Sequence, residues 1–272
     1  MTRTVGATLA TLVVVLAGAV TVASAETIRI GGTGVALGGM RILGTAFEQQ
    51  NAGTTIEVLP SLGSSGGVRA LLAGAVDLSV ASRALKDKET DKGAVARLYA
   101  TTSLALVTSE GAQVDRVTTE ELAEIYSGAR QTWPSGETIR VVLRPISETD
   151  TKILRALSAE MAQAVDAAFE RQGLVSASND QENAETLERL PGALGVVAIG
   201  QIATEARRLK VLRLDGSLPN AEGSYAQHPE FVKSLYLVTT GSASPVARAF
   251  VGYVLSEEGQ AILASYDHIP VR

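Results

Sequence analysis

A run of small residues, Gly63-Ser64-Ser65-Gly66-Gly67, most constrains this chain, because an amphipathic helical pattern follows it directly. Apolar residues then recur on one helical face, namely Val68, Leu71, Leu72 and Ala75. The first turn of a helix has backbone N–H groups without intrahelical partners and carries a partial positive charge. Glycines let a ligand approach the backbone, and the serine hydroxyls add donors. The run therefore predicts a small-anion site, with a flexible turn whose serine caps the helix as the alternative.

The N-terminal residues predict export. Arg3 is followed by an uncharged, largely apolar run that ends in Ala23-Ser24-Ala25. This pattern is typical of a secretory signal peptide over residues 1–25, cut after Ala25, and the alternative is an uncleaved membrane anchor. The chain has no cysteine to carry a lipid or form a disulfide. We therefore expect a freely soluble periplasmic protein.

Charge and motif content exclude several classes of protein. The chain has 24 Lys and Arg against 29 Asp and Glu, a net charge of −5, so it has no general attraction for nucleic acid. His228 and His268 stand alone, without a histidine pair or cysteines at metal-ligand spacing. No nucleophile elbow, phosphate-binding P-loop or dinucleotide fingerprint occurs. We expect no enzymatic activity, cofactor, metal or nucleic-acid partner.

Strands and helices alternate in the first third of the mature chain, with a helix expected over residues 39–51. The expected strands are residues 27–30, 55–59 and 76–80. This alternation predicts a parallel α/β sheet with right-handed crossovers, in which ligands bind beyond the carboxyl ends of the strands. The loops that should converge there are residues 31–34, 63–67 and 82–83.

The second part of the chain continues the alternation. Thr118 and Glu121 form a capping box for a helix that ends at Gly128. A polar loop, residues 144–150, leads from a strand into another helix. The further expected strands are residues 104–108, 139–143, 194–199, 209–214 and 235–239.

Five segments occur in a characteristic order: GGVRALLAGAVD (66–77), ASR (81–83), TEELAEIYSG (119–128), PGALGVV (191–197) and LSEEGQ (255–260). In this order they resemble the phosphate-binding components of bacterial uptake transporters, within the type II periplasmic binding proteins. The third segment, followed by a loop with Trp133, is similar to the family's LxxIYxG…W stretch. The resemblance covers essentially the whole mature chain.

The resemblance implies an α/β fold with two lobes, each a mostly parallel sheet flanked by helices, joined by two crossing hinge strands near residues 105–108 and 236–239. One lobe would hold residues 26–104 plus 238–272, and the other residues 105–237. Such a protein captures phosphate or a related oxyanion and delivers it to an ABC permease in the inner membrane. We expect it to act as a monomer.

The family's binding loops map onto four places in this sequence. The matching residues are Thr33 and Gly34 in the first loop, Ser64, Ser65, Gly66 and Gly67 in the second, Ser82 and Arg83 in the third, and Arg144 at the start of the fourth. The fourth loop continues with the further candidates Ser147, Thr149 and Asp150.

The fourth loop also departs from the family pattern. Where relatives have Gly-Ser-Gly-Thr-Arg, this chain has Ser147-Glu148-Thr149-Asp150-Thr151. An unpaired carboxylate about 4 Å from an anion costs roughly 4 kcal/mol at an effective dielectric constant of 20.

Three interpretations of this loop stay open. Asp150 or Thr149 caps the helix, with Glu148 exposed. Alternatively, one carboxylate accepts the proton of monohydrogen phosphate, which sulfate does not carry. In the third, the ligand is a phosphonate, an amino-bearing anion or a polyol. A binding-protein fold used as a sensor, without transport, is a further alternative.

Overall fold

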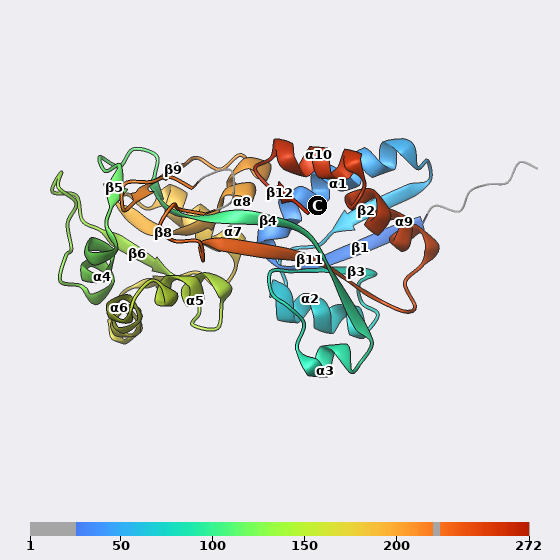
Figure 1. Ribbon diagram of the computed structural model, residues 1–272, viewed down its shortest axis with the longest axis horizontal. Helices are drawn as coiled ribbons and strands as arrows, with labels where there is room; N and C mark the ends of the chain where they lie inside the picture. Colours follow the sequence, from blue (N-terminus) through green and yellow to red (C-terminus); the bar gives the residue numbers. More distant parts are fainter. Residues whose placement is uncertain (1–25, 220–223, 272) are drawn as a thin grey trace, which may run out of the picture.

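The computed structural model describes residues 26–219 and 224–271. The predicted signal peptide, residues 1–25, lies outside the described residues. Two α/β lobes lie along the long axis of the molecule, and long strands connect them (Figure 1).

The first lobe is a sheet covered by helices on both faces. Its strands are β1 (Glu26–Gly32), β2 (Thr54–Val58), β3 (Leu78–Ala81), β11 (Val232–Thr240), β12 (Ile269–Pro270) and the first part of β4 (Ala94–Ser109), and its helices are α1 (Gly34–Gln50), α2 (Gly63–Leu72), α3 (Asp87–Thr90), α9 (Pro245–Val254) and α10 (Glu257–Ser265). The order is β2-β1-β3-β11-β4. β1 pairs in parallel with β2 and β3, whereas β11 is antiparallel to β3 and β4. The loops that follow β1 and β3 therefore leave the same edge of the sheet.

The second lobe continues the sheet through the far end of β4. Its other strands are β5 (Arg116–Val117), β6 (Arg140–Leu143), β7 (Val175–Ser176), β8 (Ala193–Ala198), β9 (Leu209–Val211) and β10 (Arg213–Leu214), and its helices are α4 (Thr119–Ser127), α5 (Thr149–Ala156), α6 (Ala159–Glu170), α7 (Asp180–Arg189) and α8 (Ile199–Thr204). The order is β4-β8-β6-β7, with β9 also paired to β4 and β5 paired to β10. The helices α5 and α7 follow β6 and β7, so both begin at the same edge of this sheet.

Several local predictions are confirmed. The hydroxyl of Thr118 accepts the N–H of Glu121 at 3.1 Å, and the Glu121 carboxylate accepts the N–H of Thr118 at 2.9 Å. Gly128 ends α4 with a φ of 91°, in the left-handed region. The expected strands are present, with shifts of one to three residues at their ends, except in two places. The strand expected over residues 104–108 is the last part of a much longer strand, β4, which begins at Ala94. Residues 209–214 divide into β9 and β10 because they pair with different partners.

The first helix begins five residues earlier than the sequence pattern suggested, at Gly34 instead of 39. The early turns are rich in glycine because α1 packs against the second lobe. A Cβ atom on Gly38 would lie 2.4 Å from the Thr204 hydroxyl of α8. An apolar periodicity cannot reveal a contact that depends on the absence of a side chain.

The hydrophobic cores indicate where the chain passes between lobes. Ala100 packs in the core of the first lobe and Leu104 in that of the second. On the return, Phe231 belongs to the second core and Leu235 to the first. We propose crossings at residues 100–104 and 231–235, a few residues from the boundaries that the resemblance suggests. Among the described residues, none of the helices has the length and apolar character needed to cross a membrane.

Two neighbouring glycines in α2 test how tightly this helix is seated on the sheet. A Cβ on Gly67 would lie 2.5 Å from the Gly32 Cα and 2.6 Å from the Ser79 hydroxyl. A Cβ on Gly66 would meet side chains alone, Leu62 at 3.2 Å and Arg69 at 4.0 Å. We expect Gly67→Ala to lower the free energy of unfolding by about 1–3 kcal/mol through overpacking. Gly66→Ala should be nearly neutral, because the higher helix propensity of alanine offsets a small adjustment. Urea unfolding of both variants measures this, and equal stability would contradict the tight seating of α2.

Candidate functional site

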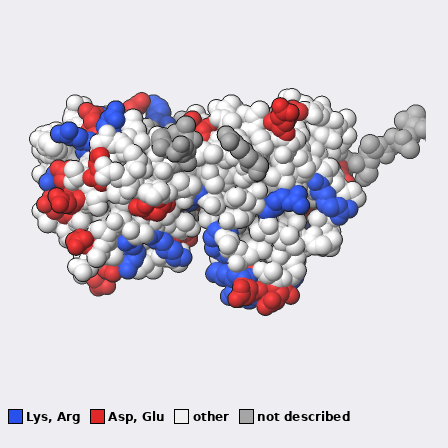
Figure 2. Space-filling model, viewed as in Figure 1, with Lys and Arg blue, Asp and Glu red and all other residues white. Residues whose placement is uncertain are grey.

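A cleft of about 800 Å³ opens between the two lobes. The first lobe contributes the start of α2 and the loop after β3, the second lobe contributes the starts of α5 and α7, and β11 forms the floor. Figure 2 shows Lys and Arg side chains on both sides of the hollow between the lobes. The cationic residues that line the cleft are Arg69, Arg83, Lys86 and Lys152, and the carboxylate that lines it is Glu148. A local positive field therefore exists on a chain with a net charge of −5.

Three hydroxyls of the first lobe lie close together, and two of them, those of Ser64 and Ser82, line the cleft. The Ser64 hydroxyl accepts the backbone N–H of Ser82 at 3.0 Å, and the Ser82 hydroxyl lies 3.3 Å from it. The Thr33 hydroxyl lies 3.2 Å from that of Ser82. The structure thus brings together the loops after β1 and β3 and the start of α2, three places that the sequence singled out.

The start of α2 is open to the cleft. Gly63 has a φ of 64°, a left-handed conformation that favours glycine. The N-cap residue, Leu62, provides no side-chain cap. The Ser61 hydroxyl accepts the Gly63 N–H at 3.4 Å. Residues 63–66 line the cleft, so the first turn, uncapped by its own N-cap residue, lies at the cleft wall.

Arg83 is held at the edge of the cleft by an acidic partner. Its guanidinium donates to both carboxylate oxygens of Glu89, at 2.7 and 2.9 Å, and to the Ser65 hydroxyl at 2.9 Å. The Arg83 hydrogen bonds lower the pKa of Glu89 to about 2. Arg83 is therefore oriented towards the second loop, with part of its charge already neutralised.

Arg144 lies beneath the cleft and not in its wall. Its side chain is only 3% exposed and donates to the Ala177 carbonyl at 2.8 Å and to the Asp180 carboxylate at 3.3 Å. Its Nε atom has no hydrogen-bond partner and lies 3.8 Å from the Asp150 carboxylate. Arg144 thus belongs to a buried ionic cluster that also contains Lys233.

Asp150 faces the same cluster. Its carboxylate accepts a hydrogen bond from the Lys233 ammonium at 2.5 Å, and both side chains are nearly inaccessible. Burial alone would lower the pKa of Lys233, but Asp150 and Asp180 outweigh this effect and raise it. The Asp150 carboxylate is therefore paired with Lys233, and it is not an unpaired charge next to the ligand.

The interpretation of Asp150 or Thr149 as the helix cap is wrong, since Glu148 is the N-cap residue of α5 and its side chain forms no cap. Glu148 is half-buried, with 39% of its side chain exposed. Burial raises the pKa of Glu148, and the nearby Asp180 and Asp150 add to the rise, although Arg144 opposes it.

The candidate residues divide into two groups. Those that line the cleft are Ser64, Ser65, Gly66, Ser82, Arg83, Ser147 and Thr149, and those outside its lining are Thr33, Gly34, Gly67, Arg144 and Asp150. Sequence reasoning missed Lys152, one turn into α5, and Ser178 and Asn179, which precede α7. The Ser-Asn pair before a helical pattern was a usable signal, because Asn179 caps α7.

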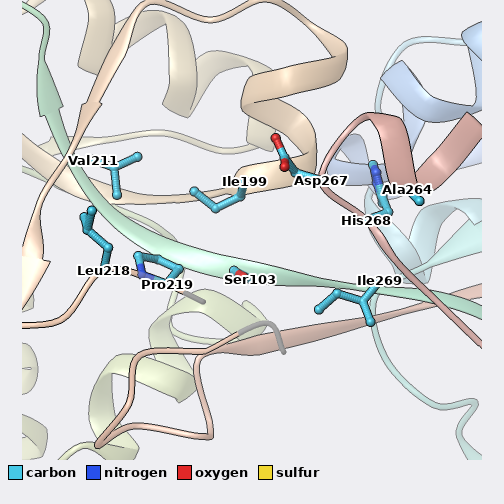
Figure 3. Close-up of a pocket in the computed structure, with 9 residues that line it drawn as sticks. All are labelled: Ser103, Ile199, Val211, Leu218, Pro219, Ala264, Asp267, His268 and Ile269. Carbon is cyan, nitrogen blue, oxygen red and sulfur yellow. The ribbon is translucent and has the colours of Figure 1, made fainter. Parts of the chain in front are cut away.

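A second pocket, of about 470 Å³, has a different chemistry (Figure 3). Its lining is mainly apolar, and Ser103, Asp267 and His268 are its polar members. Burial lowers the pKa of His268, so the ring is neutral at pH 7. This pocket offers no positive charge to an anion. Within the described residues, no group of three or more metal-ligating side chains is placed to hold a metal ion.

The sequence profile of the PBP superfamily domain matches residues 17–258. The chain belongs to this family. The fold is that of the type II periplasmic binding proteins, as similarity to solved structures shows. A Clostridium perfringens protein solved with bound phosphate superposes with a TM-score of 0.74 at 20% identity, covering 91% of this chain and all of that one.

Two other oxyanion-binding proteins are similar to this chain, one in sequence and one in structure. A Bacillus subtilis phosphate-binding protein, PstS, is 25% identical over 231 residues, which is 83% of this chain and 74% of the relative. The periplasmic molybdate-binding protein of Azotobacter vinelandii superposes with a TM-score of 0.61 at 19% identity, covering 90% of this chain and all of that one. These relatives are substrate-binding proteins and not enzymes, and they bind different oxyanions.

The Arg83–Glu89 pair gives a pH prediction. Because the folded pKa of Glu89, about 2, lies below its ordinary value of 4.5, its stabilisation is fully present above pH 4.5 and is lost as the pH falls towards 2. We expect Glu89→Gln to lower the free energy of unfolding by about 2–3 kcal/mol at pH 7. The difference from the unmodified protein should shrink between pH 4.5 and 3 in urea titrations. Glu57→Gln, at an exposed site on β2, is the control, and a pH-independent difference at Glu89 would argue against the ion pair.

Proposed function

We propose that this protein is an exported solute-binding protein that captures phosphate or a related oxyanion in the cleft for an ABC-type uptake transporter. The observation that carries the proposal is the cleft itself, in which cationic and hydroxyl groups from both lobes gather on an acidic protein. The phosphate- and molybdate-binding relatives support the ligand class. The signal-peptide pattern supports a periplasmic location and an inner-membrane permease as the partner.

The ligand would lie between the uncapped start of α2 and the start of α5. Ser64 and Ser65 supply hydroxyls on one side, and Thr149 and Lys152 lie on the other. Micromolar affinity requires about 8 kcal/mol, and each charge-assisted hydrogen bond contributes about 1.5–3 kcal/mol. Four or five such contacts suffice after association costs are subtracted.

Glu148 is the carboxyl group that we propose to accept the proton of monohydrogen phosphate. It lines the cleft, whereas Asp150 is engaged by Lys233. A carboxylate whose pKa is raised is a better proton acceptor. Because sulfate has no proton to donate, an ionised Glu148 would repel it, and the site would favour phosphate.

Ligand-dependent thermal unfolding tests the proposed function. The protein is freed of bound ligand by unfolding and refolding, then heated with phosphate, sulfate, molybdate or methylphosphonate. At 100 times the dissociation constant, phosphate should add about 2.7 kcal/mol of stability, which is a rise in Tm of roughly 5–10 °C.

Lys152→Gln should weaken phosphate binding about tenfold, equivalent to ~1.4 kcal/mol. Lys88→Gln removes the same charge from an exposed position outside the cleft lining and should have little effect. An absence of response to every oxyanion would refute the proposed ligand class, leaving a sensor or a different polar ligand.

Glu148→Gln tests the discrimination between anions. Above its raised pKa, Glu148 is ionised and repels sulfate, and below that pKa it is neutral and can donate a hydrogen bond. Sulfate should therefore bind the unmodified protein more tightly as the pH falls. In Glu148→Gln, sulfate should bind about tenfold more tightly at pH 8, with a flat pH profile.

Glu120→Gln, on the exposed surface of α4, controls for the change in net charge. Calorimetric titration between pH 5 and 8 provides the measurement. If sulfate binds the unmodified protein and the Glu148→Gln variant with the same pH dependence, Glu148 plays no part in selecting the ligand.

A further inference from the structure

The Asp180 carboxylate bridges the two lobes. Asp180 is the first residue of α7, and one of its oxygens accepts the N–H of Val35 at 3.1 Å. Val35 lies in the first turn of α1, whose N-cap residue, Thr33, makes no side-chain cap. A carboxylate from the second lobe thus caps the first helix of the other lobe, where the helix end favours negative charge.

The other Asp180 oxygen faces two buried cations. It lies 3.3 Å from the Arg144 guanidinium and 3.8 Å from the Lys233 ammonium. All three side chains are more than nine-tenths buried. A helix N-terminus, a guanidinium and an ammonium group form a donor set that suits a small oxyanion. A carboxylate of the chain occupies it.

The backbone beside this carboxylate is shaped to admit it. A Cβ on Gly34 would lie 2.8 Å from an Asp180 oxygen and 2.3 Å from the Gln181 side-chain oxygen. The Gln181 amide also donates to the Gly34 carbonyl at 2.9 Å. Gly34, which the family resemblance assigned to ligand binding, therefore makes room for residues 180 and 181 of the same chain.

The cluster retains an unused donor, and its two cations depend on Asp180. Arg144 Nε is buried without a hydrogen-bond partner. Arg144 and Lys233 both face Asp150 and Asp180, and the half-exposed Glu148 carboxylate lies 3.7 Å from Arg144. Removal of Asp180 would take away the carboxylate nearest to Arg144, which is costly for a buried cation unless another anion enters.

We propose that Asp180 is a built-in anion that fills the inner oxyanion position at the start of α1 and confines the external ligand to the outer cleft, at the starts of α2 and α5. Asp180 thereby determines where an oxyanion binds. The outer location rests on the proposed function, whereas the filling of the inner position does not.

Chemical rescue of Asp180→Ala tests this inference. The substitution removes a carboxylate and leaves space of about the size of formate. We expect the variant to be destabilised in chloride, and formate or phosphate to restore its Tm saturably at constant ionic strength. The fitted dissociation constant for formate should be at least tenfold lower than in the unmodified protein.

Asp180→Asn is the matched control. It makes the same charge change and keeps an oxygen for the Val35 N–H, but it leaves no space for formate. Rescue should therefore be absent or much weaker. If Asp180→Ala fails to fold in chloride, the measured quantity is the yield of folded protein after refolding in formate, compared with the yield in chloride.

The outcomes separate the two proposals. Equal formate responses in Asp180→Ala, Asp180→Asn and the unmodified protein, or no recovery of Asp180→Ala in any anion, would overturn the role of Asp180. Formate rescue combined with no phosphate response in the unmodified protein would uphold the inner position and refute the phosphate function. Phosphate binding by the unmodified protein, without formate rescue of Asp180→Ala, would support the phosphate function and refute the role of Asp180.

Discussion

The buried ionic cluster of Arg144, Asp150, Asp180 and Lys233 is the interaction on which the arrangement of the lobes depends. Its four members come from the end of β6, the start of α5, the start of α7 and strand β11. An isolated buried charge is costly, whereas a charge with paired partners is tolerated. Each of these four segments must therefore take up its place for the others to be stable. Asp180 extends the constraint to α1 through the N–H of Val35.

The same cluster shapes the electrostatics of the cleft above it. Its two cations are paired with Asp150 and Asp180, so the cluster itself contributes little net attraction to a ligand. Attraction comes instead from cations in the cleft wall, such as Lys152 and Lys86, and from the uncapped start of α2. Burial, with a smaller contribution from Asp180 and Asp150, raises the pKa of Glu148, which lies between the cluster and the cleft.

Local patterns in the sequence predicted much of the fold. The alternation of strands and helices, the capping box at Thr118 and the left-handed Gly128 each depend on neighbours a few residues apart. The environment of Arg144 could not be predicted in this way, because Asp180 and Lys233 lie far from it in sequence. The sequence identified the first and second loops as places that come together, but it could not show that the glycine of the first loop accommodates Asp180.

In the proposed site, the two lobes would contribute different kinds of groups to an oxyanion. The first lobe offers hydroxyls and backbone N–H groups, which suit almost any small anion. The second lobe supplies Glu148 directly and Asp180 from below, and carboxylates discriminate by charge and by proton content. Ligand choice in this protein would therefore reside in the second lobe, at the starts of α5 and α7. A similarity that extends over both lobes shows the architecture, but the choice of ligand depends on a few side chains at the ends of strands and helices.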